Sequence, residues 1–124
     1  MSEHDETNKD ANLIQALSDA ARVIDEANRS RSLTKAGRAL QKHGNRPDSA
    51  FPKPTGSPSD LNRAGQEIVD DILTTPGTTI TERFHPRYGY VIDVRAPDGR
   101  GLRYSQNRIL IGFLQSQLKR RLES

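Results

Sequence analysis

The sequence has no cysteine and no tryptophan among its 124 residues. The absence of cysteine excludes disulfide bonds, thiolate nucleophiles and the usual structural zinc sites. Only 32% of the residues are hydrophobic, so the core of this single domain must be small. No apolar run is long enough to span a membrane, and the polar, acidic first residues do not form a signal peptide. We therefore expect no membrane insertion by this domain.

The charge is distributed unevenly along the chain. Residues 1–31 carry seven acidic and four basic side chains, a balance of −3, whereas residues 32–124 have a balance of +6. A basic segment of this size favours a polyanionic partner, which among soluble proteins usually means nucleic acid. Many small basic domains bind nothing anionic, so charge alone leaves that alternative open.

The N-terminal part of the chain divides into two segments. Residues 1–10 are polar and are predicted to be a disordered tail. Leucine, isoleucine and alanine then recur at spacings of three and four over residues 11–28, which predicts a helix with one apolar stripe. We assign this acidic helix to a segment of its own, 11–31, and the basic domain to residues 32–124.

Capping residues indicate where two further helices begin. A short helix over about 33–43 has two candidate N-caps, Ser32 and Thr34. A longer helix begins at Ser57, which is followed by proline at the first helical position and by an acid three residues on, and it ends before Gly77. The segment between these helices holds three prolines, which makes helix or central strand unlikely there.

After Gly77 the hydrophobic period changes to two, which indicates β-strands. The predicted strands are 78–85, 89–97, 101–105 and 108–114. Their connections are short, and short connections join antiparallel neighbours. The predicted fold class is therefore α+β, with N-terminal helices packed on a four-stranded antiparallel β-meander.

Alternation along the strands assigns their side chains to two faces. The apolar set, expected beneath the long helix, is Ile80, Phe84, Tyr90, Ile92, Val94, Leu102, Tyr104, Ile109, Ile111 and Phe113. The polar set is Thr79, Thr81, Arg83, His85, Asp93, Arg95, Arg103 and Ser105. An exposed antiparallel face is often simply polar. Arginine forks match phosphate oxygens, and histidine exchanges protons near neutral pH, so we interpret the cluster as a phosphate site.

The segment QKHGNRPDSAFPKPTG, residues 41–56, adds a second histidine. His43 ends the predicted second helix, where it can serve as a cap that complements the helix dipole. Alternatively, it forms an acid–base pair with His85, while the proline-rich segment holds Phe51 against the core and His43 over the sheet. A metal site at His43, His85 and Asp93 lacks closely spaced ligands, so we predict no metal and no cofactor.

Four stretches in order resemble the C-terminal toxin domains of bacterial polymorphic and contact-dependent inhibition systems: LTKAGRALQKHGNRPDSAFPKPTG, GQEIVDDILTTPG, RFHPRYGYVIDVRAPDGRGLRYS and IGFL. The subgroup is the one with the Barnase–EndoU–colicin–RelE-like (BECR) ribonuclease fold, and the resemblance runs from about Leu33 to Leu114. It implies metal-independent cleavage of RNA, often tRNA, and a cognate immunity protein that blocks the site. The acidic helix lies outside these stretches and is either residual linker or a cover over the basic face.

Matching motif positions give the site residues that the resemblance implies. The catalytic candidates are His43, Arg83, His85, Arg103 and Ser105. The candidates for binding substrate phosphates are Lys42, Arg46, Arg87 and Arg95. The face assignment adds Thr81, whose hydroxyl can help Ser105 complete a phosphate cradle.

The leading hypothesis is a monomeric endoribonuclease toxin with RNA, most often tRNA, as substrate. Either His43 or His85 takes the proton of a ribose 2′-hydroxyl, which attacks the adjacent phosphorus and leaves a 2′,3′-cyclic phosphate. This hypothesis implies a delivered effector that acts in the target-cell cytoplasm. A metal-dependent nuclease is a further alternative, which a chelator would reveal.

The rival hypothesis is a non-catalytic, cytoplasmic basic module that binds RNA or an acidic protein. A sheet that binds RNA usually offers exposed aromatic rings for base stacking. The strand aromatics belong to the apolar set here, and only Tyr88, in a turn, is expected to be free. The pattern therefore favours phosphate chemistry over base stacking.

Overall fold

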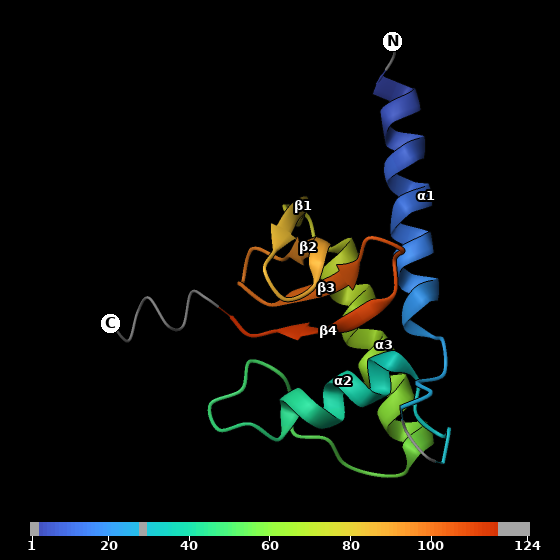
Figure 1. The fold of residues 1–124 in the computed structure, drawn as a ribbon, viewed down its shortest axis with the longest axis vertical. Coiled ribbons are helices and arrows are strands. Elements are labelled where there is room, and N and C mark those ends of the chain that lie inside the picture. The colour runs from blue at the N-terminus through green and yellow to red at the C-terminus, as the bar shows by residue number, and fades with distance from the viewer. Residues whose placement is uncertain (1–2, 28–29, 117–124) are drawn as a thin grey trace.

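The computed structural model describes residues 3–27 and 30–116. These contain the helices α1 (Glu3–Ala21), α2 (Lys35–Gly44) and α3 (Pro58–Thr74), followed by the strands β1 (Thr79–His85), β2 (Gly89–Arg95), β3 (Gly101–Ser105) and β4 (Leu110–Leu114) (Figure 1). The strands form an antiparallel sheet in the order β1-β2-β3-β4. The predicted α+β class and the β-meander are confirmed.

The caps of α2 and α3 form as the sequence predicts. Thr34 is the N-cap of α2, and its side chain accepts a hydrogen bond from the backbone N–H of Gly37. Ser57 and Asp60 form the capping box of α3, in which each side chain accepts a hydrogen bond from the other residue's backbone N–H. These caps set the starting points of α2 and α3, which together contribute eight buried hydrophobic side chains to the core.

The bounds of α1 differ from the prediction. The helix begins at Glu3, inside the segment predicted to be disordered, and it ends at Ala21 instead of residue 28. The chain leaves the helix because its backbone pairs with a later segment, at an antiparallel bridge between Ile24 and Thr34. The apolar residues after Ala21 continue the helical spacing, but they lie on this paired loop.

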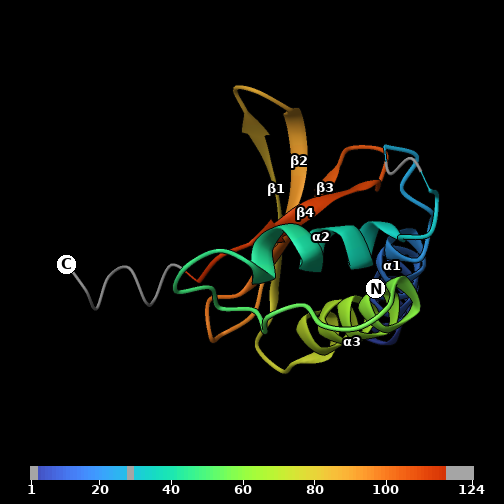
Figure 2. The ribbon, with the colours of Figure 1, turned by 90° about the horizontal axis from the view of Figure 1, so that it is seen from below.

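The helices enclose one face and one edge of the sheet. α3 contacts β2 and β3, while α2 lies alongside the edge strand β4 and crosses α3 (Figures 1 and 2). The crossing of α2 and α3 is close, because a Cβ at Gly65 would collide with the carbonyl oxygen of Ala36. The largest fully buried side chains of this core include Tyr104, Phe113 and Leu40.

The hairpin of β1 and β2 projects beyond the helical layer (Figure 2). Ile80, Phe84 and Tyr90 were expected in the buried apolar set, but they are 37%, 58% and 60% exposed. The prediction is wrong here because α3 reaches β2 and β3 but makes no contact with β1 among the described residues. The rings of Phe84 and Tyr90 pack edge to face at 5.5 Å, so exposed aromatics are present on this sheet after all.

Strand β4 departs from regular alternation through a β-bulge. Arg103 pairs with Gly112, whereas the next residue, Tyr104, pairs with Leu110, which leaves Ile111 as the extra residue. Leu110 is therefore buried, and Ile109 and Ile111 are 49% and 38% exposed, contrary to their predicted place in the apolar set. A shift of one residue moves a strand's side chains to the opposite face.

Helix α1 packs on α3 and joins the same core. Leu17 and Ala21 are fully buried, and the carbonyl oxygen of Leu17 accepts a hydrogen bond from the Tyr104 hydroxyl at 2.8 Å. The hydroxyl of Ser18 donates to Oδ1 of Asp70 on α3 at 2.6 Å. The described part of α1 is therefore held against α3, and it does not form a cover over the cationic sheet face.

Truncation of Leu17 tests whether α1 belongs to the folding unit. Leu17→Ala leaves a cavity in the core, so we expect the free energy of unfolding to fall by about 2–5 kcal/mol in urea denaturation. Asn12→Ala changes an exposed position on the same helix and should alter that free energy by less than about 0.5 kcal/mol. Equally small effects of both substitutions would show that α1 contributes nothing to the core.

Candidate active site

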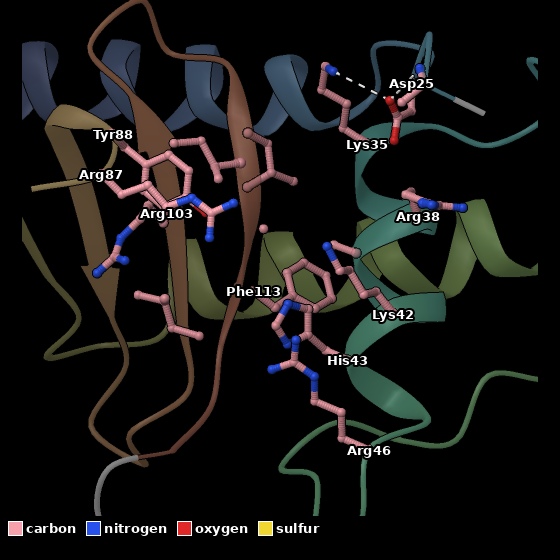
Figure 3. Close-up of a pocket in the computed structure, with 16 residues that line it drawn as sticks. Asp25, Lys35, Arg38, Lys42, His43, Arg46, Arg87, Tyr88, Arg103 and Phe113 are labelled. Atoms are coloured by element: carbon pink, nitrogen blue, oxygen red, sulfur yellow. Dashed lines mark hydrogen bonds and ion pairs between the residues drawn. The ribbon is translucent and has the colours of Figure 1, made fainter. Parts of the chain in front are cut away.

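A cavity of about 520 Å³ lies between α2, the open sheet face and the β1–β2 turn (Figure 3). Its wall is strongly cationic and includes Lys35, Arg38, Lys42, Arg46, Arg87 and Arg103. His43 and Tyr88 also line it, and among the described lining residues Asp25 is the single carboxylate. Cationic walls around a hollow concentrate positive potential, so the cavity is suited to a polyanion.

Two phenylalanines position His43 at the end of α2. Its ring centroid lies 6.4 Å from that of Phe51 and 6.3 Å from that of Phe113, and the two phenylalanine rings are 4.8 Å apart. The amide of Gln115 joins the loop after α2 to the end of β4, because its Oε1 accepts from the backbone N–H of Ala50 at 2.8 Å. The prediction that the proline-rich segment holds Phe51 in the core and His43 over the sheet is confirmed.

The imidazole of His43 is held in its neutral form. Burial, followed by the positive charges of Arg46 and Lys42, lowers its pKa from 6.5 to about 4. Its Nδ1 is buried and has no hydrogen-bond partner among the described residues, so no acceptor there stabilises the charged ring. The imidazole of His43 is therefore uncharged at physiological pH and adds no positive charge at the helix C-terminus.

Gly112 of β4 leaves room for His43 over the sheet face that carries Arg103. Arg103 and Gly112 are register partners across β3 and β4, so their Cβ directions share a face at a separation of about 5 Å. A Cβ at position 112 would stand 3.6 Å from Nε2 of His43. Nε2 therefore lies over the open sheet face at Gly112, on the cavity wall that Arg103 also lines, and the absence of a side chain at Gly112 leaves it uncovered.

Asp93 fixes two arginines on the open face. Its Oδ1 and Oδ2 accept hydrogen bonds from Nε and Nη2 of Arg103 at 2.7 and 2.9 Å, and Oδ2 accepts another from Nε of Arg83 at 3.0 Å. Burial disfavours the charged carboxylate, but these hydrogen bonds outweigh it and lower the pKa of Asp93 below its ordinary value. Arg103 is thereby held with its guanidinium toward the cavity (Figure 3).

Comparison with known proteins identifies the family. The sequence model of the CdiA C-terminal tRNase toxin domain matches residues 24–115. The chain belongs to this family. Members are tRNase toxins, so the chain is an endoribonuclease, and the resemblance seen in the sequence is confirmed. No curated protein matches the chain.

A solved structure agrees with this assignment. The toxic C-terminal tip of CdiA from Pseudomonas aeruginosa, solved in complex with immune protein, is 26% identical to this toxin domain. The match has a TM-score of 0.64 and covers 78% of this chain and 99% of that chain. The arrangement of helices followed by an antiparallel sheet is thus shared with a CdiA toxin tip.

The cavity of the toxin domain gathers half of the sequence-predicted site residues. His43 and Arg103 from the catalytic candidates line it, together with Lys42, Arg46 and Arg87 from the substrate-binding candidates. Arg83 does not line the cavity, but it shares Asp93 with Arg103. These residues come from α2, the loop after it, β3 and the β1–β2 turn.

The other candidates serve turns and strand ends. Nδ1 of His85 accepts hydrogen bonds from the backbone N–H groups of Arg87, at 3.0 Å, and of the next residue. Ser105 Oγ accepts from the N–H of Ile109 at 3.1 Å, and Arg95 donates to the carbonyl oxygens of Gly99 and Gln115. Thr81 is exposed on the edge strand β1, outside the cavity lining. His85 therefore accepts hydrogen bonds within the turn that presents Arg87 to the cavity.

The sequence did not predict four of the residues that line the cavity, namely Asp25, Lys35, Arg38 and Tyr88. It also did not predict that Asp93 holds Arg103 through hydrogen bonds. A signal for two of them was present, because positions 35, 38, 42 and 46 are all basic and follow helical spacing. Asp25 gave no signal, since it was assigned to a helix that ends before it.

The described residues contain no group of three His, Asp or Glu side chains placed to hold a metal ion. His43, His85 and Asp93, the set considered from the sequence, are divided between the cavity wall, a turn and an arginine clamp. Among the described helices, none has both the length and the hydrophobicity to cross a membrane.

Removal of the Asp93 charge should weaken the fold in a pH-dependent manner. Its folded-state pKa is lowered, so its contribution is present above the unfolded pKa, near 4, and is lost as the pH falls below that value. We expect Asp93→Asn to be less stable than wild type by about 1–3 kcal/mol at pH 6 in urea denaturation, with a smaller difference at pH 3.

The matched control is Asp19→Asn, which alters a carboxylate that is 62% exposed on α1. It should change stability little at either pH. A loss in Asp93→Asn that is the same at pH 6 and pH 3 would contradict the ionised clamp.

Proposed function

We propose that this domain cleaves tRNA in the cavity by metal-independent transesterification, with the 2′-hydroxyl of the RNA as the nucleophile. The observation that carries the proposal is the placement of His43 Nε2 over Gly112, which is the register partner of Arg103 on the open sheet face. A neutral base and a fixed guanidinium on one surface provide what a phosphodiester needs for this reaction. Only RNA reacts in this way, because DNA lacks the 2′-hydroxyl.

The proposed step transfers one proton to the enzyme and one to the leaving group. Nε2 of His43 accepts the proton of the 2′-hydroxyl while O2′ forms a bond to the adjacent phosphorus. Arg103 stabilises the additional negative charge on the phosphoryl oxygens. The P–O5′ bond breaks, and the ammonium of Lys42, which points into the cavity in Figure 3, gives its proton to O5′. The products carry a 2′,3′-cyclic phosphate and a 5′-hydroxyl.

Substrate binding adjusts the basicity of His43. In the free domain, Arg46 and Lys42 contribute to the low pKa of the imidazole. Bound phosphates place negative charge beside these cations and offset their effect on the ring. The pKa of His43 is therefore higher in the complex than in the free domain, which makes it a stronger base when the 2′-hydroxyl is in place.

The arginines of the cavity differ in exposure and in hydrogen bonding, which supports different roles for them in the proposed reaction. The side chain of Arg103 is 14% exposed and donates two hydrogen bonds to Asp93, so its guanidinium is preorganised. Arg46 and Arg87 are exposed at the cavity rim, where they can bind phosphates of a longer RNA strand. Arg103 is therefore suited to the reacting phosphate, and Arg46 and Arg87 are suited to the adjacent phosphates of the RNA strand.

We also propose where the domain acts and how it is inhibited. The domain is delivered into a target cell, acts on tRNA in its cytoplasm and is blocked in the producing cell by a cognate immunity protein. Support comes from the family and from the Pseudomonas aeruginosa CdiA tip, which was solved in complex with immune protein. An inhibitor of this cavity would present acidic side chains to its cationic wall.

The histidine assignment is tested with total tRNA and excess chelator. We expect wild type to give discrete fragments in EDTA and His43→Ala to lower the cleavage rate by about 10²–10⁴-fold. His85→Ala should lose less activity, because His85 supports the turn and does not line the cavity. Loss of wild-type cleavage in EDTA, restored by added metal, would overturn the metal-independent reaction.

Gly112→Ala is a second test of the same placement. The added methyl group fits at ordinary contact distance, 3.6 Å from Nε2, so the fold should persist while the base is covered. We expect cleavage at least about tenfold slower, with an unchanged circular dichroism spectrum. Full activity in this variant would show that Nε2 does not face the reacting group.

The pH profile supplies a third test. The base is active when deprotonated, so kcat/KM should stay flat as the pH falls from 7 and drop only near the free-domain pKa of about 4. The corresponding limb of kcat should lie at higher pH, because bound phosphates raise the pKa of His43. An acidic limb of kcat/KM near 6.5 would contradict the assignment of His43.

A further inference from the structure

The cavity contains a carboxylate that the cleavage step does not use. Asp25, on the loop after α1, lies at one end of the cavity and faces Lys35 of α2, with 3.9 Å between Oδ1 and Nζ (Figure 3). The side chains of Asp25 and Lys35 are only 16% and 23% exposed. Oδ1 also accepts the backbone N–H of Ala27 at 3.0 Å, whereas no donor among the described residues reaches Oδ2. Among the described residues, Oδ2 of this partly buried carboxylate is thus available to a ligand.

The two ends of the cavity differ in chemistry. A carboxylate repels phosphate, so RNA phosphates belong at the end of the cavity with His43. Lys35 and His43 are eight positions apart on α2, which corresponds to about 12 Å along the helix axis. A purine nucleotide measured from its phosphate to its Watson–Crick edge is of comparable length. A base can therefore reach Asp25 while its sugar and phosphate lie at His43.

We propose that Asp25 and Lys35 form a guanine-recognition site, and that the domain cleaves RNA on the 3′ side of a guanosine. The inference rests on the proposed function, because it adds a base preference to the same cavity. The carboxylate of Asp25 accepts hydrogen bonds from guanine N1–H and N2–H. The ammonium of Lys35 donates to guanine O6, which adjoins N1.

Guanine fits this pair because its Watson–Crick edge has two adjacent donors next to one acceptor. Adenine, cytosine and uracil each present a single donor position on that edge. With any of them the carboxylate of Asp25 would gain only one hydrogen bond to the base, whereas guanine gives it two. RNA is commonly read through the Watson–Crick edges of unstacked bases, as this site requires.

The first experiment changes the substrate and leaves the protein intact. Wild-type cleavage sites in tRNA are mapped, and the guanosine that supplies the 2′-hydroxyl is replaced by inosine, which keeps N1–H and O6 but lacks the N2 amino group. We expect kcat/KM to fall about tenfold, since a bidentate contact to a base discriminates by roughly 5–150-fold. Inosine cleaved as fast as guanosine would overturn the proposal.

The second experiment changes the protein. Asp25→Asn keeps an oxygen for the Ala27 N–H but loses the ability to accept two hydrogen bonds from guanine. We expect its kcat/KM on the guanosine substrate to fall about tenfold, to the level of inosine, while its rate on inosine changes little. Asp19→Asn, an exposed carboxylate on α1, should keep the wild-type preference for guanosine.

The outcomes separate this inference from the proposed function. Cleavage at sites that share no guanosine, or an Asp25→Asn variant that retains the guanosine-to-inosine ratio, would overturn base recognition and leave the cleavage mechanism standing. A wild-type domain that cleaves no tRNA would overturn both. The site would be supported if all wild-type cleavage sites share a guanosine and if Asp25→Asn cleaves the guanosine and inosine substrates with nearly equal kcat/KM.

Discussion

The packing of Phe51 against Phe113 determines where the functional groups of this toxin domain lie. The two rings join the proline-rich loop after α2 to strand β4, and His43 rests against both. Without this contact the end of α2 would have no fixed position over the sheet, and Nε2 of His43 would not lie above Gly112. The same contact desolvates the imidazole and thereby lowers its pKa.

Several positively charged side chains line the cavity, and two carboxylates reduce the repulsion between them. Asp93 lies beneath the sheet arginines and neutralises part of their charge, while Asp25 does the same for Lys35 at the other end. The remaining positive potential faces the cavity and is available to an anionic substrate. Asp93 orients Arg103 for phosphate, whereas Asp25, on the cavity wall, is the group that we propose binds a base.

Much of the fold was predictable because it depends on local signals. The capping box at Ser57 and the alternation in β2 and β3 are each decided within a few residues. The misplaced residues depend on distant contacts: Phe84 is exposed because α3 does not reach β1, and Ile111 because of a bulge. For the site, His43 and Arg103 were predictable as residue types in a known pattern, but Asp25 required the loop pairing that ends α1.

The central claim is that the cavity promotes attack by the RNA's own 2′-hydroxyl. The most direct test is a tRNA substrate that carries one 2′-deoxynucleotide immediately 5′ of the mapped cleavage bond, incubated with wild-type protein. We expect this single change to abolish cleavage at that bond, while an unmodified tRNA yields a fragment ending in a 2′,3′-cyclic phosphate. Cleavage of the deoxy-substituted bond at an undiminished rate would contradict it.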